Sequence, residues 1–305
     1  MTLRCADLFA GVGGFSLGAE QAGAKVVWAA NHWKWAVDVH AMNLPNTQHS
    51  CQDLQQANFH AIPKVHVVLS SPACQGHSQA SQPKRRRFHD ALRSTAWAVV
   101  SCADAVEPGF IVIENVLDFR RWRLYSAWCD ALRTLGYALE EHVLTASHHG
   151  VPQRRKRLFI VASRSKAPMG LTFEKTAEPG IEGVLELSHR VKWTRIEDAS
   201  ANVRKRIDKG RRNHGPIFLT QHVTGHPGVP LDEPIRTVTT KDQWALVWGD
   251  RYRPLTVREN ARAMGFPDSY QLPEGACRRD LIKGLGNAVC PPVARDIITK
   301  IQAAA

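Results

Sequence analysis

The residues of this chain best suited to chemistry are a cysteine, a glutamate and two closely spaced arginines. Cys74 and Glu114 each stand just after a short apolar run, and Arg155 and Arg157 alternate before another. A thiolate can form covalent intermediates, a buried carboxyl group can donate a proton, and arginines bind anions. The set therefore indicates covalent catalysis. Each member also has a simpler interpretation: a small buried hydrophobe, a capping or ion-paired glutamate, and an exposed basic strand start.

A glycine cluster is the second chemical signal. Gly11, Gly13 and Gly14 follow an apolar run and precede a helical pattern. Glycines at this point let the backbone approach a ligand at the positive end of the helix dipole. The spacing lacks the G-x-x-G tail of the dinucleotide fingerprint. A ligand loop and a tight structural turn are therefore both open.

The elements that must position these residues alternate between strands and helices. Apolar, β-branched runs predict strands over residues 8–10, 25–29, 65–69, 110–113 and 158–162, and helical patterns cover 15–22, 36–42, 94–106 and 125–135. This alternation predicts βαβ units, hence an α/β doubly wound, Rossmann-like parallel sheet. Cys74 then lies at the carboxyl end of a strand, where ligands and catalytic groups gather in such sheets.

The composition of the chain changes after residue 163. Residues 164–250 are richer in Pro, Gly, Arg and Thr, which predicts a small, inserted, β-leaning domain. Helical periodicity returns over 257–264 and 292–301. We therefore predict a catalytic domain of residues 1–163 plus 251–305, and a second domain of residues 164–250.

The charge and cysteine content narrow the class of protein. The 305 residues include 40 Lys and Arg against 28 Asp and Glu, a net charge of +12 that favours a nucleic-acid partner. The seven cysteines include no Cys-x-x-Cys pair, which argues against a disulfide framework or a structural zinc site. No apolar run reaches about 18 residues. We expect a soluble, cytoplasmic protein that needs no metal.

Six motifs, taken together, resemble the DNA cytosine-C5 methyltransferases of bacterial or phage type, in the order that this family has. The motifs are Asp7-Leu8-Phe9-Ala10-Gly11-Val12-Gly13-Gly14-Phe15-Ser16, Pro72-Ala73-Cys74-Gln75-Gly76, Glu114-Asn115-Val116, Gly150-Val151-Pro152-Gln153-Arg154-Arg155-Lys156-Arg157, Leu255-Thr256-Val257-Arg258-Glu259 with Gly265-Phe266-Pro267, and Gly286-Asn287-Ala288-Val289. Each motif alone is weakly specific, but they cover both ends of the chain.

The resemblance implies transfer of a methyl group from S-adenosylmethionine to carbon 5 of a cytosine flipped out of a specific duplex DNA sequence. Carbon 5 is a poor nucleophile, and addition of the Cys74 thiolate to carbon 6 makes it enamine-like. Glu114 would act on N3 in its protonated form, which burial beside the base favours. In the family, arginines placed as Arg155 and Arg157 hold the flipped base and its phosphates.

The resemblance also assigns binding residues. The cofactor residues it implies are Phe9, Ala10, Gly11, Gly13, Gly14, His32, Trp33, Asp53, Leu54, Pro72, Asn287 and Ala288. In the loop after the cysteine, the resemblance implies DNA contacts from Gln75, Ser78 and Arg93, and the basic run of Lys84, Arg85, Arg86 and Arg87 suits backbone phosphates. Residues 164–250 occupy the place of the target-recognition domain, where we expect base contacts from Gln221, Arg236, Thr237, Thr239 and Lys241.

Two positions depart from the family pattern. His32 replaces the acidic residue that binds the ribose hydroxyls, which predicts weaker cofactor binding or an altered, more anionic donor. Ala73 replaces the proline before the cysteine, which loosens the turn but removes no chemical group.

Three alternatives remain beside the main hypothesis. One is the tRNA methyltransferase branch of the same fold, which carries a Cys-Phe-Thr signature; residues 164–250 contain no cysteine. Another is a DNA-binding homologue without catalysis, although such proteins lose the Cys or Glu that this chain keeps. The third transfers another group from a modified donor. We expect a monomer, and the sequence leaves open the target site and whether a separate restriction endonuclease acts with it.

Overall fold

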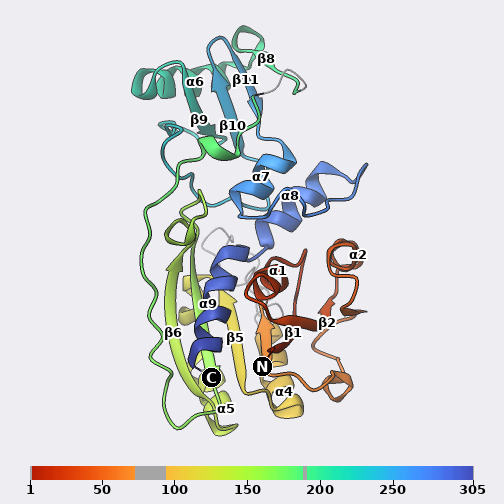
Figure 1. Cartoon of the computed structure of the whole chain (residues 1–305). Helices are drawn as coiled ribbons and strands as arrows, with labels where there is room; N and C mark the ends of the chain where they lie inside the picture. The colour runs from red at the N-terminus through yellow and green to blue at the C-terminus, as the bar shows by residue number, and fades with distance from the viewer. Residues whose placement is uncertain (1, 73–93, 188–190, 305) are drawn as a thin grey trace. The chain divides into compact units, whose positions relative to one another are not determined.

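The structure is a computed structural model that describes residues 2–72, 94–187 and 191–304 (Figure 1). The chain forms two compact units. The first contains residues 1–145, 156–174 and 288–305, and the second contains residues 146–155 and 175–287. This division differs from the predicted domain boundaries, because residues 251–287 group with the second unit.

The first unit is built on a seven-stranded sheet of order β3-β2-β1-β4-β5-β7-β6. Strands β1 to β5 are mutually parallel, and β7 runs antiparallel between β5 and β6. Their bounds are β1 Arg4–Leu8, β2 Lys25–Asn31, β3 Gln48–Cys51, β4 Val67–Ser70, β5 Phe110–Asn115, β6 Ala138–Thr145 and β7 Lys156–Ser163.

Helices cover both faces of this sheet. Their bounds are α1 Gly14–Gln21, α2 Lys34–Asn43, α4 Trp97–Val106, α5 Tyr125–Thr134 and α9 Pro291–Ala304. Helices α4 and α5 pack on one set of alternating strand residues, which includes Leu8, Ile111 and Leu158. Helices α1 and α9, red and blue respectively in Figure 1, pack against each other. A Cβ atom at Gly18 would lie 2.3 Å from the carbonyl of Pro291, so this contact requires glycine.

The α/β doubly wound sheet is confirmed, and most of its elements lie where the sequence predicts them. Sequence periodicity missed β3 and β6, because both carry polar residues: β3 reads QHSC and β6 reads ALEEHVLT. The first strand covers Arg4–Leu8, so the predicted strand over residues 8–10 overlaps it only at Leu8. The antiparallel direction of β7 was also not predicted, because an apolar run does not reveal strand direction.

The second unit contains an antiparallel sheet of order β8-β11-β10-β9. Its elements are β8 Thr194–Arg195, α6 Ala201–His214, β9 Ile217–Gln221, β10 Trp244–Trp248, β11 Arg251–Pro254, α7 Val257–Ala263 and α8 Arg278–Asn287. The β-leaning expectation for residues 164–250 missed the 14-residue helix α6. Its sequence, ANVRKRIDKGRRNH, has too few apolar residues to mark a helical face clearly.

A buried ion pair joins parts of the second unit. The Arg253 guanidinium donates to both carboxylate oxygens of Glu259 at 2.7 Å, and both side chains are fully buried. Glu259 also accepts from the backbone of Thr256 and Glu186, the former completing a capping box at α7. Although burial disfavours the carboxylate, these donors lower the pKa of Glu259. Glu259, part of a sequence motif, therefore has a structural role.

Short 3₁₀ helices complete the description of the chain. They are η1 Phe59–Ala61, η3 Ser94–Ala96, η4 Leu117–Arg121, η5 Ala146–His149, η6 Glu182–Val184 and η7 Ile196–Asp198. Within the described ranges, no helix has the length and apolarity needed to cross a membrane.

Candidate active site

One edge of the first unit gathers the sequence-predicted cofactor residues. In a parallel sheet, strands that are neighbours in the sheet bring their carboxyl ends side by side. The order β3-β2-β1-β4 therefore aligns the segments that follow four strands. These segments carry Asp53 and Leu54 after β3, His32 and Trp33 after β2, Phe9 to Gly14 after β1, and Pro72 after β4.

The glycine loop between β1 and α1 has a backbone that favours glycine. Gly11 and Gly13 have φ angles of +54° and +83°, in the left-handed region. Phe9 also has a positive φ of 61°, which is rare for an aromatic residue and indicates local strain. No side chain caps α1, whose N-cap is Gly13. Gly13 thus offers no side chain to cap the first N–H groups of α1, although the Asp7 carboxylate accepts from the backbone N–H of Ser16.

The residues after β2 and β3 offer an aromatic surface and a carboxylate. Trp33 stacks on Trp35 with ring centroids 4.7 Å apart. Asp53 is exposed, and one of its oxygens accepts from the backbone N–H of Gln55 at 3.0 Å. His32 is also exposed. An aromatic ring and a carboxylate acceptor suit an adenine ring and its amino group.

A chain of buried polar side chains lies next to the glycine loop, and the sequence analysis missed it. Ser16 donates to Asp7 at 2.6 Å, His40 Nε2 lies 2.9 Å from Ser16, and His49 lies 2.8 Å from His40. Burial raises the pKa of Asp7 to about 7, and burial beside His49 lowers the pKa of His40 to about 3. His40 and His49 are nine residues apart, a spacing that gives no sequence signal. Their contact depends on the pairing of β3 beside β2.

Asn115 positions the start of the segment that carries the cysteine. Its side-chain amide donates to the carbonyl of Pro72 at 3.3 Å, and its oxygen accepts from the backbone N–H of Val116. The amide therefore connects the ends of β4 and β5. Cys74 lies outside the described residues, as do Gln75, Ser78, Lys84, Arg85, Arg86, Arg87 and Arg93.

Glu114 and Arg157 meet at the same edge of the sheet. Glu114 is 8% exposed at the end of β5, and Arg157 lies near the start of the antiparallel strand β7. The guanidinium Nε lies 3.1 Å from the Glu114 carboxylate. Because the charge pair is largely screened from water, Arg157 fixes the position of this carboxylate.

Arg155 has different partners from Arg157. Its guanidinium donates to the carbonyls of Val238 and Gly286 at 3.1 and 3.0 Å, within the second unit, and the residue is 5% exposed. Gln153 is fully buried there and bridges Val238 and Ala263 through hydrogen bonds of 2.7 and 2.9 Å. Gln153 and Arg155, two of the three residues of the Gln-x-Arg-x-Arg motif, therefore bind backbone groups inside the second unit.

Comparison with known proteins decides the family. The model of the family described as C-5 cytosine-specific DNA methylase matches residues 3–182 and 180–303. The chain belongs to this family. As the sequence analysis predicted, it is a DNA cytosine-5 methyltransferase by family and enzyme class.

Individual relatives match nearly the full length of the chain. The type II methyltransferase M.NlaX of Neisseria lactamica is 29% identical over 98% of this chain and 96% of its own length. The type II methyltransferase M.HhaI of Haemophilus parahaemolyticus is 27% identical over 94% and 90%. A crystal structure of Dnmt2 methyltransferase from S. pombe superimposes with a TM-score of 0.72 at 19% identity, covering 99% of both chains. This last likeness shows the shared fold.

In this methyltransferase, the predicted base-reading residues have unequal exposure. Arg236 and Lys241 are exposed. Gln221 is 7% exposed and donates to the side chain of Gln243, which also contacts the Thr239 hydroxyl. The backbone of residues 239–240 packs directly against Gly286, because a Cβ atom at Gly286 would come within 2.3 Å of that backbone. Thr237 is partly exposed.

The last predicted cofactor residues lie where the chain passes from one unit to the next. Asn287 is the exposed final residue of α8 in the second unit, and Ala288 is a buried residue of the first.

Among the residues that the structure describes, no group of three or more His, Cys, Asp or Glu side chains is arranged to hold a metal ion.

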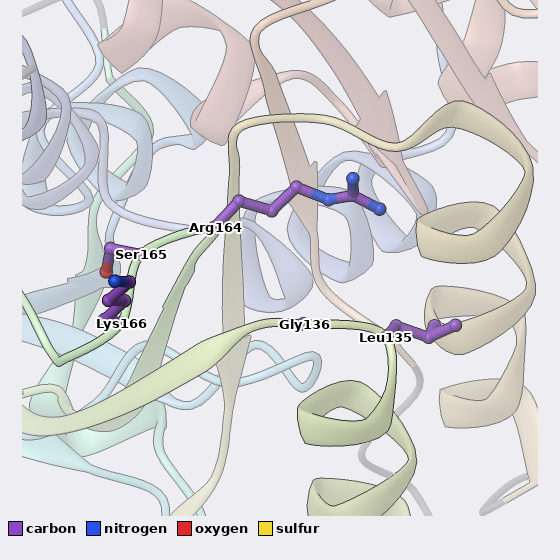
Figure 2. A pocket seen from close by; sticks show the side chains of 5 residues that line it. All are labelled: Leu135, Gly136, Arg164, Ser165 and Lys166. Carbon is purple, nitrogen blue, oxygen red and sulfur yellow. The ribbon is translucent and has the colours of Figure 1, made fainter.

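A surface pocket lies away from these residues. Its volume is about 450 Å³, and Figure 2 shows Arg164, Ser165 and Lys166 after the end of β7 with Leu135 and Gly136 after α5. The antiparallel β7 ends at the opposite edge of the sheet from the glycine loop. Arg164 is bound there to Glu107 and stacks on Tyr137. This pocket is therefore separate from the candidate active site.

Proposed function

We propose that this enzyme transfers a methyl group from S-adenosylmethionine to carbon 5 of a cytosine flipped out of duplex DNA, with Cys74 as the nucleophile. The proposal rests on the contacts of two adjacent residues at the end of β5, Glu114 and Asn115. Asn115 binds the base of the Cys74 segment, and Glu114 is held by Arg157. A nucleophile and a carboxyl group on adjacent strands are what addition to a cytosine ring requires.

The first-unit edge fits the methyl donor. The N-cap of α1 is Gly13, which has no side chain, the loop before it has left-handed glycines, and the next two strand ends supply Trp33 and Asp53. When bound, the donor supplies an electrophilic methyl group on a sulfonium. We assign the glycine loop, Phe9, Ala10, Leu54 and Pro72 to its binding, with Asn287 and Ala288 contributed by the C-terminal motif.

The protein's side chains then act in sequence. The Cys74 thiolate adds to carbon 6, and the electron pair of the C5–C6 double bond moves toward carbon 5, which takes the methyl group. In the position that Arg157 fixes, Glu114 donates a proton to N3 of the ring as the thiolate adds, and it takes this proton back when Cys74 leaves. Loss of the carbon 5 proton to solvent restores the double bond as Cys74 leaves. The thiol is therefore regenerated, and one methyl group replaces one proton.

Substrate binding follows the same proposal. Arg157 would bind near the flipped base, whereas Arg155 would maintain the second unit that carries Arg236, Thr237, Thr239 and Lys241. The type II methyltransferase names of the relatives support double-stranded DNA in a restriction-modification setting. We propose that the enzyme works as a cytoplasmic monomer, with any partner nuclease acting separately.

Sequencing of modified DNA tests the proposal. Purified protein is incubated with duplexes of varied sequence and S-adenosylmethionine that carries a labelled methyl group, and modified cytosines are mapped. We expect label on carbon 5 of cytosines in one sequence context, and none with Cys74→Ser. No label in DNA from the wild type, or equal label from Cys74→Ser, would contradict it.

A further inference from the structure

Helix α6 concentrates positive charge in the second unit. Its 14 residues contain six Lys or Arg and one acidic residue, Asp208. The helix therefore accounts for five of the twelve net positive charges of the whole chain. None of the DNA-contacting residues predicted from the sequence lies on it.

The helix presents these charges on one face. Ile207 packs with Phe218 and Val247, and a Cβ atom at Gly210 would collide with the Phe218 ring at 2.1 Å. The face bearing Ile207 and Gly210 is therefore turned to β9, beside which α6 lies in Figure 1. At 100° per residue, the basic residues with exposed side chains span an arc of about 160° that begins beside Ile207 and continues across the opposite side of the helix. They are Arg204, Lys205, Lys209, Arg211 and Arg212.

These charges are not neutralised by carboxylates. Arg204, Lys209 and Arg211 donate to the backbone carbonyls of Glu197, Gly225 and Gly249. Among the residues that the structure describes, no ion pair includes a side chain of α6. Elsewhere in the same unit arginines do have acidic partners, as Arg262 has in Asp268 at 2.6 Å. The contrast indicates that the α6 charges serve an external anion.

The neighbouring side chains experience this positive charge. Burial, reinforced by nearby cations that include Lys209, lowers the pKa of His226 to about 4. Arg206 lies on the same helix, and its Nε and one Nη are buried without a hydrogen-bond partner. A phosphate bound to the exposed side chains of α6 would supply the negative charge that this region lacks.

We propose that the exposed face of α6 binds the sugar–phosphate backbone of duplex DNA, outside the bases that the enzyme reads. This inference rests on the proposed function, because DNA is then the polyanion that the second unit meets. From Arg204 to Arg212 the stripe extends about 12 Å, enough for consecutive phosphates. Lysine and arginine contacts of this kind position the protein without reading sequence.

A matched pair of variants tests the inference. Lys205→Gln with Arg212→Gln removes two exposed charges for which no hydrogen bond is described. The control, Lys25→Gln with Lys300→Gln, removes two exposed charges from the first unit. Affinity for a fluorescent duplex is measured without methyl donor from about 0.05 to 0.3 M salt. Thermal unfolding of each variant verifies that it is folded.

We expect the α6 variant to lower the slope of log affinity against log salt by about 2, and to bind roughly tenfold more weakly near 0.1 M salt. The loss of affinity should be equal for a duplex that contains the target sequence and for an unrelated duplex. The rate of methyl transfer at saturating DNA should not change. An unchanged slope, or the same loss in the control, would overturn the inference. An α6 variant that binds RNA more weakly but binds duplex DNA as the wild type does would also overturn it.

The same measurements separate this inference from the proposed function. If the wild type methylates DNA and the α6 variant binds it unchanged, only the inference fails. If the wild type methylates no DNA, the proposed function fails, and the salt slopes with unrelated duplex still judge whether α6 is a phosphate-binding surface.

Discussion

The two units of this methyltransferase use charged residues in different ways. In the first unit, Glu114 and Arg157 pair where β5 ends and the antiparallel strand β7 begins. In the second unit, Arg253 and Glu259 pair in the interior and bind neighbouring backbone. Glu114, Arg157 and Glu259 all belong to motifs that the sequence presents alike. A charged residue in a family motif is therefore equally able to mark chemistry or architecture.

The arginines of one motif show this most clearly. Arg155 and Arg157 are two residues apart and alternate before a strand. Arg157 contacts Glu114, whereas Arg155 holds the carbonyls of Val238 and Gly286. Their division coincides with the boundary between the units at residues 155 and 156.

The largest expected effect concerns the buried pair of the second unit. Glu259→Gln leaves the Arg253 charge buried without its carboxylate, which should cost about 3–5 kcal/mol of unfolding free energy. Urea denaturation measures it. The control is Glu197→Gln, which removes an exposed partner of Arg195 and should cost less than about 1 kcal/mol. Similar small losses for both variants would show that Glu259 is not the structural element proposed.

Two substitutions in the shared motif sharpen the comparison. Arg157→Gln should lower the single-turnover rate of methyl transfer roughly 100- to 1,000-fold, because the Glu114 carboxylate loses its positioning charge. Its unfolding temperature should stay near that of the wild type. Arg155→Gln should instead lower stability by roughly 1–3 kcal/mol, because buried carbonyls lose their donors.

The reverse pattern, with Arg155→Gln slow but stable and Arg157→Gln unstable but active, would contradict the division of roles. Both assays use the same preparations, so that a loss of folded protein is not mistaken for a loss of catalysis.

Much of this organisation was predictable from the sequence, because its signals are local. The glycine loop, the apolar strands and Glu114-Asn115-Val116 are contiguous segments, and the carboxyl ends of parallel strands must lie at one edge. The partners of Arg155 were not predictable, because they depend on residues 83 and 131 positions away. Helix α6 escaped prediction because its polar composition hides its narrow apolar face.

A pH titration tests the buried chain beside the glycine loop. Because burial raises the pKa of Asp7 to about 7, the folded protein holds a proton there that the unfolded chain releases near pH 4. This contribution to stability is therefore present at low pH and is lost as the pH rises toward 7. The difference in unfolding free energy between wild type and Asp7→Asn should fall by a few kcal/mol from pH 4 to pH 8. A difference independent of pH would show that Asp7 is ionised throughout.

The smallest expected effect concerns the departure at His32. His32→Glu restores a carboxylate able to accept from both ribose hydroxyls, so calorimetry should show S-adenosylmethionine bound roughly tenfold more tightly. His60→Glu, at another exposed histidine of the first unit, makes the same charge change and should leave affinity as it is. Unchanged or weaker binding by His32→Glu would indicate that His32 serves a different donor group.

The most direct test of the account is a covalent complex between Cys74 and the target base. In a duplex with 5-fluorocytosine at the modified position, the fluorine replaces the proton that must leave carbon 5, so that the adduct cannot resolve. With S-adenosylmethionine present, we predict a complex whose mass equals protein plus DNA plus one methyl group, and whose linked peptide contains Cys74. Absence of this complex from an active preparation, or a link to another cysteine, would contradict the account.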